Sequence, residues 1–182
     1  MTEDAPASAY DMTAEVEAQS PATFAILVDN EPGVLHRVVG LFAARGYNIE
    51  SLTVAETDRA AHTSRITIVT RGTPHVLAQI EAQLQKLVST RHVQNVTKDP
   101  DGAERELALI KVRGTGTDRV EALRLADIFR AKVIDTSVAS FIFEITGPPA
   151  KIDKFLDLMR PLGLVEVSRT GVLSIQRGGE AL

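Results

Sequence analysis

Residues 28–35 read Val28-Asp29-Asn30-Glu31-Pro32-Gly33-Val34-Leu35, a polar turn between an apolar run and a helical pattern. The apolar run that starts at Phe24 predicts a strand, and Pro32 suits the first positions of a helix. Backbone N–H groups at a helix start have no intrahelical partner and carry the positive end of the helix dipole. The turn is therefore either a site for a small zwitterion such as an amino acid or a plain strand–turn–helix connection. Taken alone, it favours the plain connection.

The pattern of apolar residues after this turn gives the order of elements in the first half of the chain. Helical spacing from Val34 to Phe42 predicts an amphipathic helix, and Gly46 is expected to end it as a left-handed residue. We expect strands at 23–28, 48–56, 65–70 and 93–97. A second helix should carry one apolar face, formed by Val76, Leu77, Ile80, Leu84, Leu87 and Val88. The predicted order is βαββαβ.

The same order is expected again in the second half. Strands are predicted at 106–113, 132–136 and 140–146, and the last two, 164–168 and 172–175, should complete a sheet. A helix at 117–130 should bury Ala122, Leu125, Ile128 and Phe129, and another should follow the break at Gly147-Pro148-Pro149. The predicted fold class is α+β, with two ferredoxin-like domains of the split βαβ type. Each such sheet carries its helices on one face, so we expect the first domain to dimerise, by pairing at a sheet edge or by packing on the bare face.

Composition shifts indicate where the domains begin and end. Residues 1–20 contain five acidic residues and no Lys or Arg, and we expect a disordered acidic tail there. We place the first domain at 21–98, a linker at 99–104, the second domain at 105–178 and a short tail at 179–182. The first 20 residues lack the basic and apolar regions of a signal peptide, so we expect a cytoplasmic protein.

Charge and residue usage argue against several classes of function. After residue 20, 19 of the 24 acidic residues stand against all 20 basic ones, so no basic surface for nucleic acid is expected. Aromatic residues make up only 4% of the chain, too few for an RNA-stacking strip, and no apolar run is long enough to span a membrane. The chain has no Cys, and its four His are scattered, so neither a metal site nor a catalytic residue is assigned.

A family resemblance emerges when these motifs are read together. The run 29–35, a helix, and then Gly46-Tyr47-Asn48-Ile49-Glu50-Ser51-Leu52 resembles the ACT domain of the small, regulatory subunit of acetolactate synthase. In the second half, Phe129-Arg130-Ala131-Lys132-Val133-Ile134-Asp135 and Arg169-Thr170-Gly171 are similar to the same family. The resemblance covers residues 22–178, and the run after Gly46 makes it more specific than the turn alone.

The resemblance implies a regulatory role with no chemistry in this chain itself. Subunits of this family bind a larger catalytic subunit that uses thiamine diphosphate, Mg²⁺ and FAD. That enzyme condenses two pyruvates to 2-acetolactate and CO₂ in branched-chain amino-acid biosynthesis. The small subunit activates its partner and, in many members, confers feedback inhibition by valine, which lies between the ACT domains of a homodimer.

The same resemblance assigns residues to the valine site. Asn30, Gly33, Val34 and Leu35 should form the side contributed by one protomer, and Asn48 and Ile49 the side contributed by its neighbour. Open N–H groups near Gly33 can take the carboxylate and amide oxygens can take the ammonium group. His36 departs from the family pattern, which often has a small residue there, and is expected to modify the pocket.

The sequence is also compatible with functions related to this one. The chain can be an ACT-domain amino-acid sensor for another enzyme, or an activator without valine sensitivity. A catalytic interpretation lacks a nucleophile–base pair and a thiamine-diphosphate motif. An amino-acid-responsive transcription factor needs a helix-turn-helix, and no stretch supplies one. The sequence leaves open which surface docks on the catalytic subunit, the stoichiometry, and which of valine, leucine and isoleucine binds best.

Overall fold

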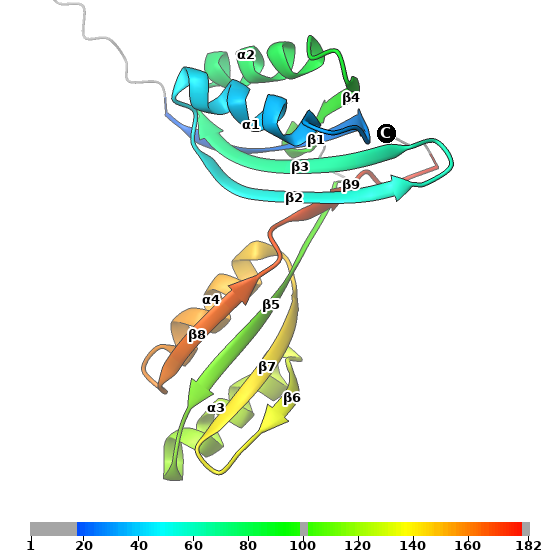
Figure 1. The fold of residues 1–182 in the computed structure, drawn as a ribbon. Helices are drawn as coiled ribbons and strands as arrows, with labels where there is room; N and C mark the ends of the chain where they lie inside the picture. Colours follow the sequence, from blue (N-terminus) through cyan, green and yellow to red (C-terminus); the bar gives the residue numbers. More distant parts are fainter. Residues whose placement is uncertain (1–17, 99–101, 180–182) are drawn as a thin grey trace, which may run out of the picture.

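A computed structural model describes residues 18–98 and 102–179 of the chain, which form two α+β domains (Figure 1). In the first domain, helices α1 and α2 cover one face of a four-stranded antiparallel sheet with strand order β2-β3-β1-β4. The elements are β1 (Ser20–Asp29), α1 (Val34–Arg45), β2 (Ile49–Asp58), β3 (Thr63–Gly72), α2 (Pro74–Gln85) and β4 (Thr90–Asn95), followed by the 3-10 turn η1 (Val96–Lys98). The predicted βαββαβ order is confirmed.

Local signals fix the helix ends of this domain. α1 begins after Gly33, whose φ is +86°, and ends at Gly46, whose φ is +68° and whose N–H donates to Ala43 O, as predicted. α2 begins at Pro74 after Thr73, whose hydroxyl accepts from the N–H of Val76. Because α2 ends at Gln85, Val88 lies in the turn before β4 and is 98% exposed. The prediction that Val88 belongs to the apolar helix face is wrong.

The core of the first domain lies between the helices and the sheet. Helix α1 buries Val34, Val38, Leu41 and Phe42, a spacing that follows one face of a helix. These side chains pack with alternate residues of the central strands, including Phe24 and Ile26 of β1 and Ile66 and Ile68 of β3. Because strand side chains alternate between faces, the residues between them point to the face without helices.

The second domain repeats the architecture with strand order β6-β7-β5-β8. Its elements are β5 (Ala103–Arg113), α3 (Gly116–Phe129), β6 (Lys132–Thr136), β7 (Ser140–Gly147), α4 (Pro149–Met159), β8 (Leu164–Arg169) and a short added strand, β9 (Leu173–Ile175). The fold class predicted from the sequence, two ferredoxin-like units, is confirmed. Residues 1–17, 99–101 and 180–182 of the predicted tails and linker lie outside the described residues, and β5 already begins inside the predicted linker range.

Two details of the second domain differ from the sequence prediction. Helix α3 buries Ala122, Leu125 and Ala126, whereas Ile128 is 58% exposed, because position 128 falls two residues past Ala126 and off that face. Strand β9 does not extend the main sheet. It pairs with the first residues of β5, Ala103 to Arg105, which project beyond the sheet toward the first domain (Figure 1).

The helix-free face of the first sheet is not bare, contrary to the expectation from the sequence. Residues 170–176 run across it (Figure 1). Arg65 of β3 donates to Ser174 O over 2.8 Å, and Gln94 of β4 donates to the Gln176 side chain over 3.0 Å. Thr23, Ala25 and Thr67 on this face are buried. Residues 170–176 therefore occupy much of the face on which a second copy was expected to pack. The other expected route, pairing at a sheet edge, is open at β2, whose outer edge has no paired strand in the described part of the chain.

Candidate functional site

The turn between β1 and α1 presents open backbone donors. Gly33 is the N-cap of α1, and no side chain caps the helix. Val34 N donates to Glu31 O within the turn, and the first helical bond runs from Arg37 N to Gly33 O over 3.0 Å. Within the described residues, no acceptor lies against the N–H groups of Leu35 and His36. Two donors at the positive end of a 12-residue helix therefore face outward and can bind a carboxylate.

Two carboxylates in this turn would oppose such a ligand, but arginines pair with both. Glu31 contacts Arg37 and the hydroxyl of Ser89, and Arg37 also donates to that hydroxyl over 2.7 Å. Asp29 accepts from Arg91 Nε over 2.6 Å. The two arginines thus neutralise the two carboxylates of the turn. The start of α1 therefore stays favourable for an anion.

Asn30 lies beside this helix start but does not cap it. Its backbone N–H donates to His62 O over 2.7 Å, and its side-chain Nδ2 donates to Glu56 Oε1 over 3.2 Å. Glu56 belongs to β2, so the turn is connected to the far end of the edge strand. The amide oxygen of Asn30 accepts no hydrogen bond in the described structure and can receive an ammonium group.

Asn48 and Ile49 lie at the opposite end of the same sheet. Asp29 aligns with Thr63 of β3, whereas Ile49 aligns with Thr70, seven residues further along that strand. Seven residues of antiparallel strand span about 24 Å. Asn48 is exposed, and its carbonyl accepts from Thr70 Oγ1 over 2.6 Å. One chain therefore does not bring the two halves of the predicted site together, consistent with the expectation that they come from different protomers.

The remaining predicted site residues occupy two environments. Val34 packs in the core, so what it offers the turn is its backbone. Leu35 is 39% exposed, and His36 is exposed beside it on the first turn of α1. Leu35 is therefore the apolar side chain available at the helix start, and His36 lies where a bound molecule would meet it.

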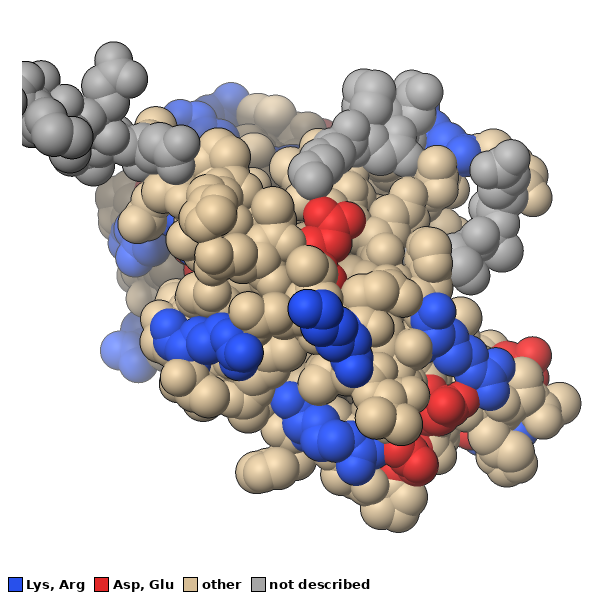
Figure 2. All heavy atoms as spheres, turned by 90° about the horizontal axis from the view of Figure 1, so that it is seen from above, with Lys and Arg blue, Asp and Glu red and all other residues tan. Residues whose placement is uncertain are grey.

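A shallow groove also lies between α1 and α2. Seen from above, this side of the molecule carries several Lys and Arg side chains and few acidic ones (Figure 2). The groove measures about 390 Å³ and includes Arg45 and Lys86 beside Leu41 and Leu87. Its charges suit an anion but provide no carboxylate for an ammonium group. It therefore matches a free amino acid less well than the start of α1 does.

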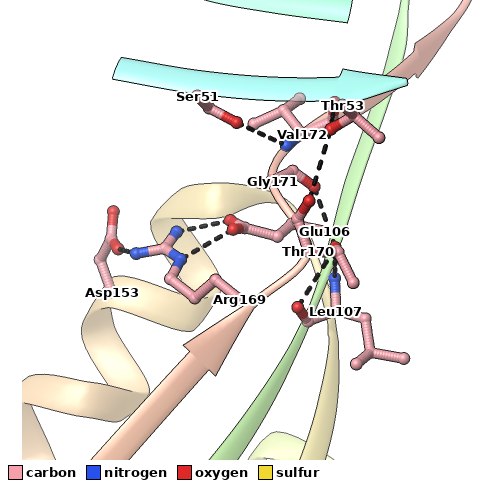
Figure 3. Close-up of polar contacts among 9 residues, drawn as sticks. All are labelled: Ser51, Thr53, Glu106, Leu107, Asp153, Arg169, Thr170, Gly171 and Val172. Atoms are coloured by element: carbon pink, nitrogen blue, oxygen red, sulfur yellow. Dashed lines mark hydrogen bonds and ion pairs between the residues drawn. The ribbon is translucent and has the colours of Figure 1, made fainter. Parts of the chain in front are cut away.

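A larger cleft, of about 720 Å³, lies where the two domains meet. Its wall holds Arg169, which donates to Glu106 from both Nε, over 2.8 Å, and Nη2, and to Asp153 over 2.6 Å (Figure 3). The hydrogen bond to Glu106 is the main reason that the pKa of the Arg169 guanidinium lies above its ordinary value. Glu106 is only 4% exposed, whereas the Arg169 side chain is 33% exposed, so a partly exposed arginine holds a buried carboxylate at the domain boundary.

Sequence reasoning missed most residues of this boundary. Ser51 and Gly171 entered the sequence analysis only as members of two family motifs, and Thr53 was assigned no role. Their common signal is small or polar residues at alternate strand positions opposite a glycine, which is typical of close backbone approach. The pairings of Asp29 and Glu31 were also missed, because their partners are distant in sequence or lie off the helical i,i+4 spacing.

The described residues contain no helix long and apolar enough to cross a membrane. Across residues 18–98 and 102–179, no group of three or more His, Asp or Glu side chains is arranged to hold a metal ion.

Comparison with known proteins identifies the family of both domains. Residues 105–178 match the family model described as small subunit of acetolactate synthase, and residues 24–92 match the AHAS small subunit-like ACT domain. A probable acetolactate synthase small subunit from Archaeoglobus fulgidus is 48% identical over 158 residues, which is 87% of this chain and 98% of that protein. The isozyme 3 small subunit from Escherichia coli is 43% identical, over 86% of this chain and 96% of that protein.

A solved structure agrees with these sequence matches. The crystal structure of an acetolactate synthase small subunit from Thermotoga maritima superposes with a TM-score of 0.78 at 39% identity, covering 88% of this chain and 99% of that one. The resemblance drawn from the motifs is therefore confirmed. With an ACT domain first and the small-subunit domain second, the chain belongs to the family of acetolactate synthase small subunits.

Proposed function

We propose that this chain is the regulatory subunit of an acetolactate synthase, which activates the catalytic subunit and makes it sensitive to valine. The observation that carries the proposal is the match to small subunits over nearly the whole described chain, including its ACT domain. The catalytic subunit would supply thiamine diphosphate, Mg²⁺ and FAD and condense two pyruvates to 2-acetolactate and CO₂. This chain would supply the effector site and the docking surface, and we expect both subunits in the cytoplasm.

The start of α1 supports an amino acid as effector. The N–H groups of Leu35 and His36 would take the carboxylate, assisted by the helix dipole. The amide oxygen of Asn30 would take the ammonium group, together with Asn48 of a second copy. Neutral dipoles can hold both charged ends without burying an imperfectly paired full charge, which is costly.

The apolar part of the site would select the side chain of the ligand. Leu35 is exposed at the helix start, and Ile49 of the second copy would face it. Valine fills such a pocket better than alanine does, because each additional buried CH₂ contributes about 0.8 kcal/mol. His36 would border the same space and limit its size.

A homodimer through β2 would complete the site. β2 is one of the two edge strands of the sheet in the described chain, and edge strands commonly pair with a second copy. Antiparallel pairing of two β2 strands around a two-fold axis would bring the start of one β2 to the end of the other. Asn48 and Ile49 of the second copy would then lie near Glu56, to which Asn30 is bonded. This arrangement would join the two half-sites that stand about 24 Å apart within one chain.

Reconstitution with the catalytic subunit of the same organism tests the function. The rate of 2-acetolactate formation is measured for the catalytic subunit alone, with this chain, and with this chain plus valine or alanine. We expect this chain to raise the rate, and valine but not alanine to lower it again. An unchanged rate on adding the chain contradicts the regulatory assignment, and activation without any response to valine contradicts the effector assignment only.

A further inference from the structure

A short segment, residues 169–172, links the second domain to strand β2 of the ACT sheet. On the second-domain side, Thr170 N donates to Leu107 O over 3.0 Å, and Leu107 N donates to Thr170 Oγ1 over 3.2 Å (Figure 3). Arg169 beside it is held by Glu106 and Asp153. Residues 169 and 170 therefore belong rigidly to the second domain.

Two residues later the same segment is bound to β2 of the ACT domain. Val172 N donates to Ser51 Oγ over 3.2 Å, and Thr53 Oγ1 lies 3.4 Å from both Thr170 O and Val172 O (Figure 3). We call residues 170–172 with Ser51 and Thr53 the junction. Val172 is itself buried.

Gly171 is the closest point of approach in the junction. Its φ is +84°, and a Cβ atom at this position would lie 2.5 Å from Ser51 Oγ and 2.9 Å from Thr53 Oγ1. A residue with a Cβ atom would force either the Ser51 and Thr53 hydroxyls or the segment itself to move. Beside the cleft, the junction therefore holds residues 170–172 in direct contact with β2, and a displacement of β2 would be passed to this segment.

The strand that holds the junction is the strand that begins at the proposed effector site. Ile49 is the first residue of β2 and Ser51 is the third. Within one chain β2 pairs only with β3, and in the proposed homodimer its other edge meets the second copy, so its position depends on how the two copies pair. A ligand that draws Asn48 and Ile49 toward the second copy's helix start acts on β2 within two residues of the junction.

We infer that the junction is the element through which effector binding at the start of β2 is transmitted to the second domain. This inference rests on the proposed function. The effector must favour one position of β2 over another, because a ligand shifts an equilibrium only by its differential affinity for the two states. The junction passes that position to Thr170 and Arg169, and so to Glu106 of β5 and Asp153 of α4. Ser51, Thr53 and Gly171 are positioning residues and do not touch the ligand.

The first test uses the reconstituted holoenzyme with the variant Gly171→Ala. Valine affinity, measured by isothermal titration, should stay within about threefold of the wild type because the effector site is untouched. The ratio of activities without and with saturating valine should fall at least about fivefold, which corresponds to loss of a coupling of roughly 1 kcal/mol. Gly178→Ala is the matched control: Gly178 also has a positive φ, +105°, but nothing lies within 4 Å of its Cβ position.

A milder variant keeps the test informative if Gly171→Ala does not fold. Ser51→Ala removes the acceptor of Val172 N–H without adding any atom to the junction. It should weaken the valine response in the same direction as Gly171→Ala. Retention of the full response in both variants, with a responsive wild type, overturns the inference and leaves the proposed function intact. A wild-type holoenzyme that neither binds nor responds to valine overturns both.

A distance measurement tests the junction without reference to activity. The chain has no Cys, so one cysteine at Gln85 on α2 and one at Lys154 on α4 can be spin-labelled specifically. With labelled chains diluted in an excess of unlabelled ones, so that only the distance within a chain is measured, we expect a single narrow distribution in the otherwise wild-type chain and in Gly178→Ala, shifted by valine. In Gly171→Ala the distribution should broaden and no longer shift. An unchanged distribution and an unchanged shift in Gly171→Ala overturn the inference.

Discussion

The side chain of Asn30 donates a hydrogen bond to Glu56 over 3.2 Å, which connects the start of α1 to the end of the edge strand β2. This bond unites the two parts of the ACT domain on which the proposal depends, the open donors of the helix and the strand available for pairing. Asn30 stands three positions before the N-cap residue Gly33, and its side chain does not cap the helix. Because its Nδ2 is engaged, its amide oxygen is the group left for a ligand.

Gly33→Asp should abolish the valine response while leaving activation largely intact. The new carboxylate would lie where the ligand carboxylate is proposed to bind, and space exists because the nearest atom to a Cβ at Gly33 is Arg37 Nη1, at 3.8 Å. The backbone at Gly33 has a positive φ, so the variant also carries strain. Activity of the reconstituted holoenzyme across a valine titration measures the effect.

Gly116→Asp serves as the control for that strain. Gly116 also has a positive φ and open space, and it begins helix α3 in the second domain. It should retain valine inhibition. Full inhibition in Gly33→Asp would mean that the effector does not bind at the start of α1.

Val54→Lys should weaken the homodimer by at least about tenfold. Val54 lies on the edge strand β2 and is 43% exposed, and a lysine there is a common way of blocking edge pairing, since it places a charge beside its copy. Sedimentation over a range of protein concentrations gives the dimer dissociation constant. Val88→Lys introduces the same charge at an exposed turn and should leave the dimer unchanged; equal dissociation constants for both variants would exclude β2 as the interface.

Arg169→Leu should destabilise the second domain by about 3 kcal/mol. It leaves Glu106 buried without its partner, and an unpaired buried charge costs several kcal/mol. Urea unfolding followed by circular dichroism measures the loss. Arg160→Leu breaks the exposed pair with Asp157 and should change stability by less than about 1 kcal/mol. A similar small loss in both variants would show that the Arg169 pair is not a structural anchor.

Removal of residues 1–18 should leave the fold and activation of the catalytic subunit unaffected. The truncation stops before Ser20 because β1 begins there and pairs with Gly72 at the end of β3. Thermal unfolding and the activation ratio are the readouts. A clearly lower unfolding temperature, or an activation ratio that is half the wild-type ratio, would assign a role to the acidic segment.

The sequence predicted the elements well where one local signal was decisive. Gly46 ended α1 as expected because only a residue that tolerates positive φ suits that position. Val88 and Ile128 were misplaced because an apolar residue one or two positions beyond a helical stripe still resembles part of it. Helix ends and the arc that faces the core are decided by packing, which periodicity does not report.

The candidate site was predictable only in part. The turn and Gly33 follow from local chemistry. Asn48 and Ile49, the half of the site expected from the second protomer, were assigned only through the resemblance to a known family. The arginine partners of Asp29 and Glu31 and the contact between Ser51 and Gly171 join residues distant in sequence. No spacing rule connects position 51 to position 171; the crossing of residues 170–176 over the ACT sheet does.

Isothermal titration of valine into the reconstituted holoenzyme, with alanine as the reference ligand, tests the central claim most directly. The account predicts saturable heat with valine and binding of alanine weaker by about 15-fold, because alanine lacks two apolar carbons, worth roughly 1.6 kcal/mol, that would contact Leu35 and Ile49. Absence of saturable heat with valine, or equal affinity for the two amino acids, would contradict the claim that this subunit senses valine through its ACT domain.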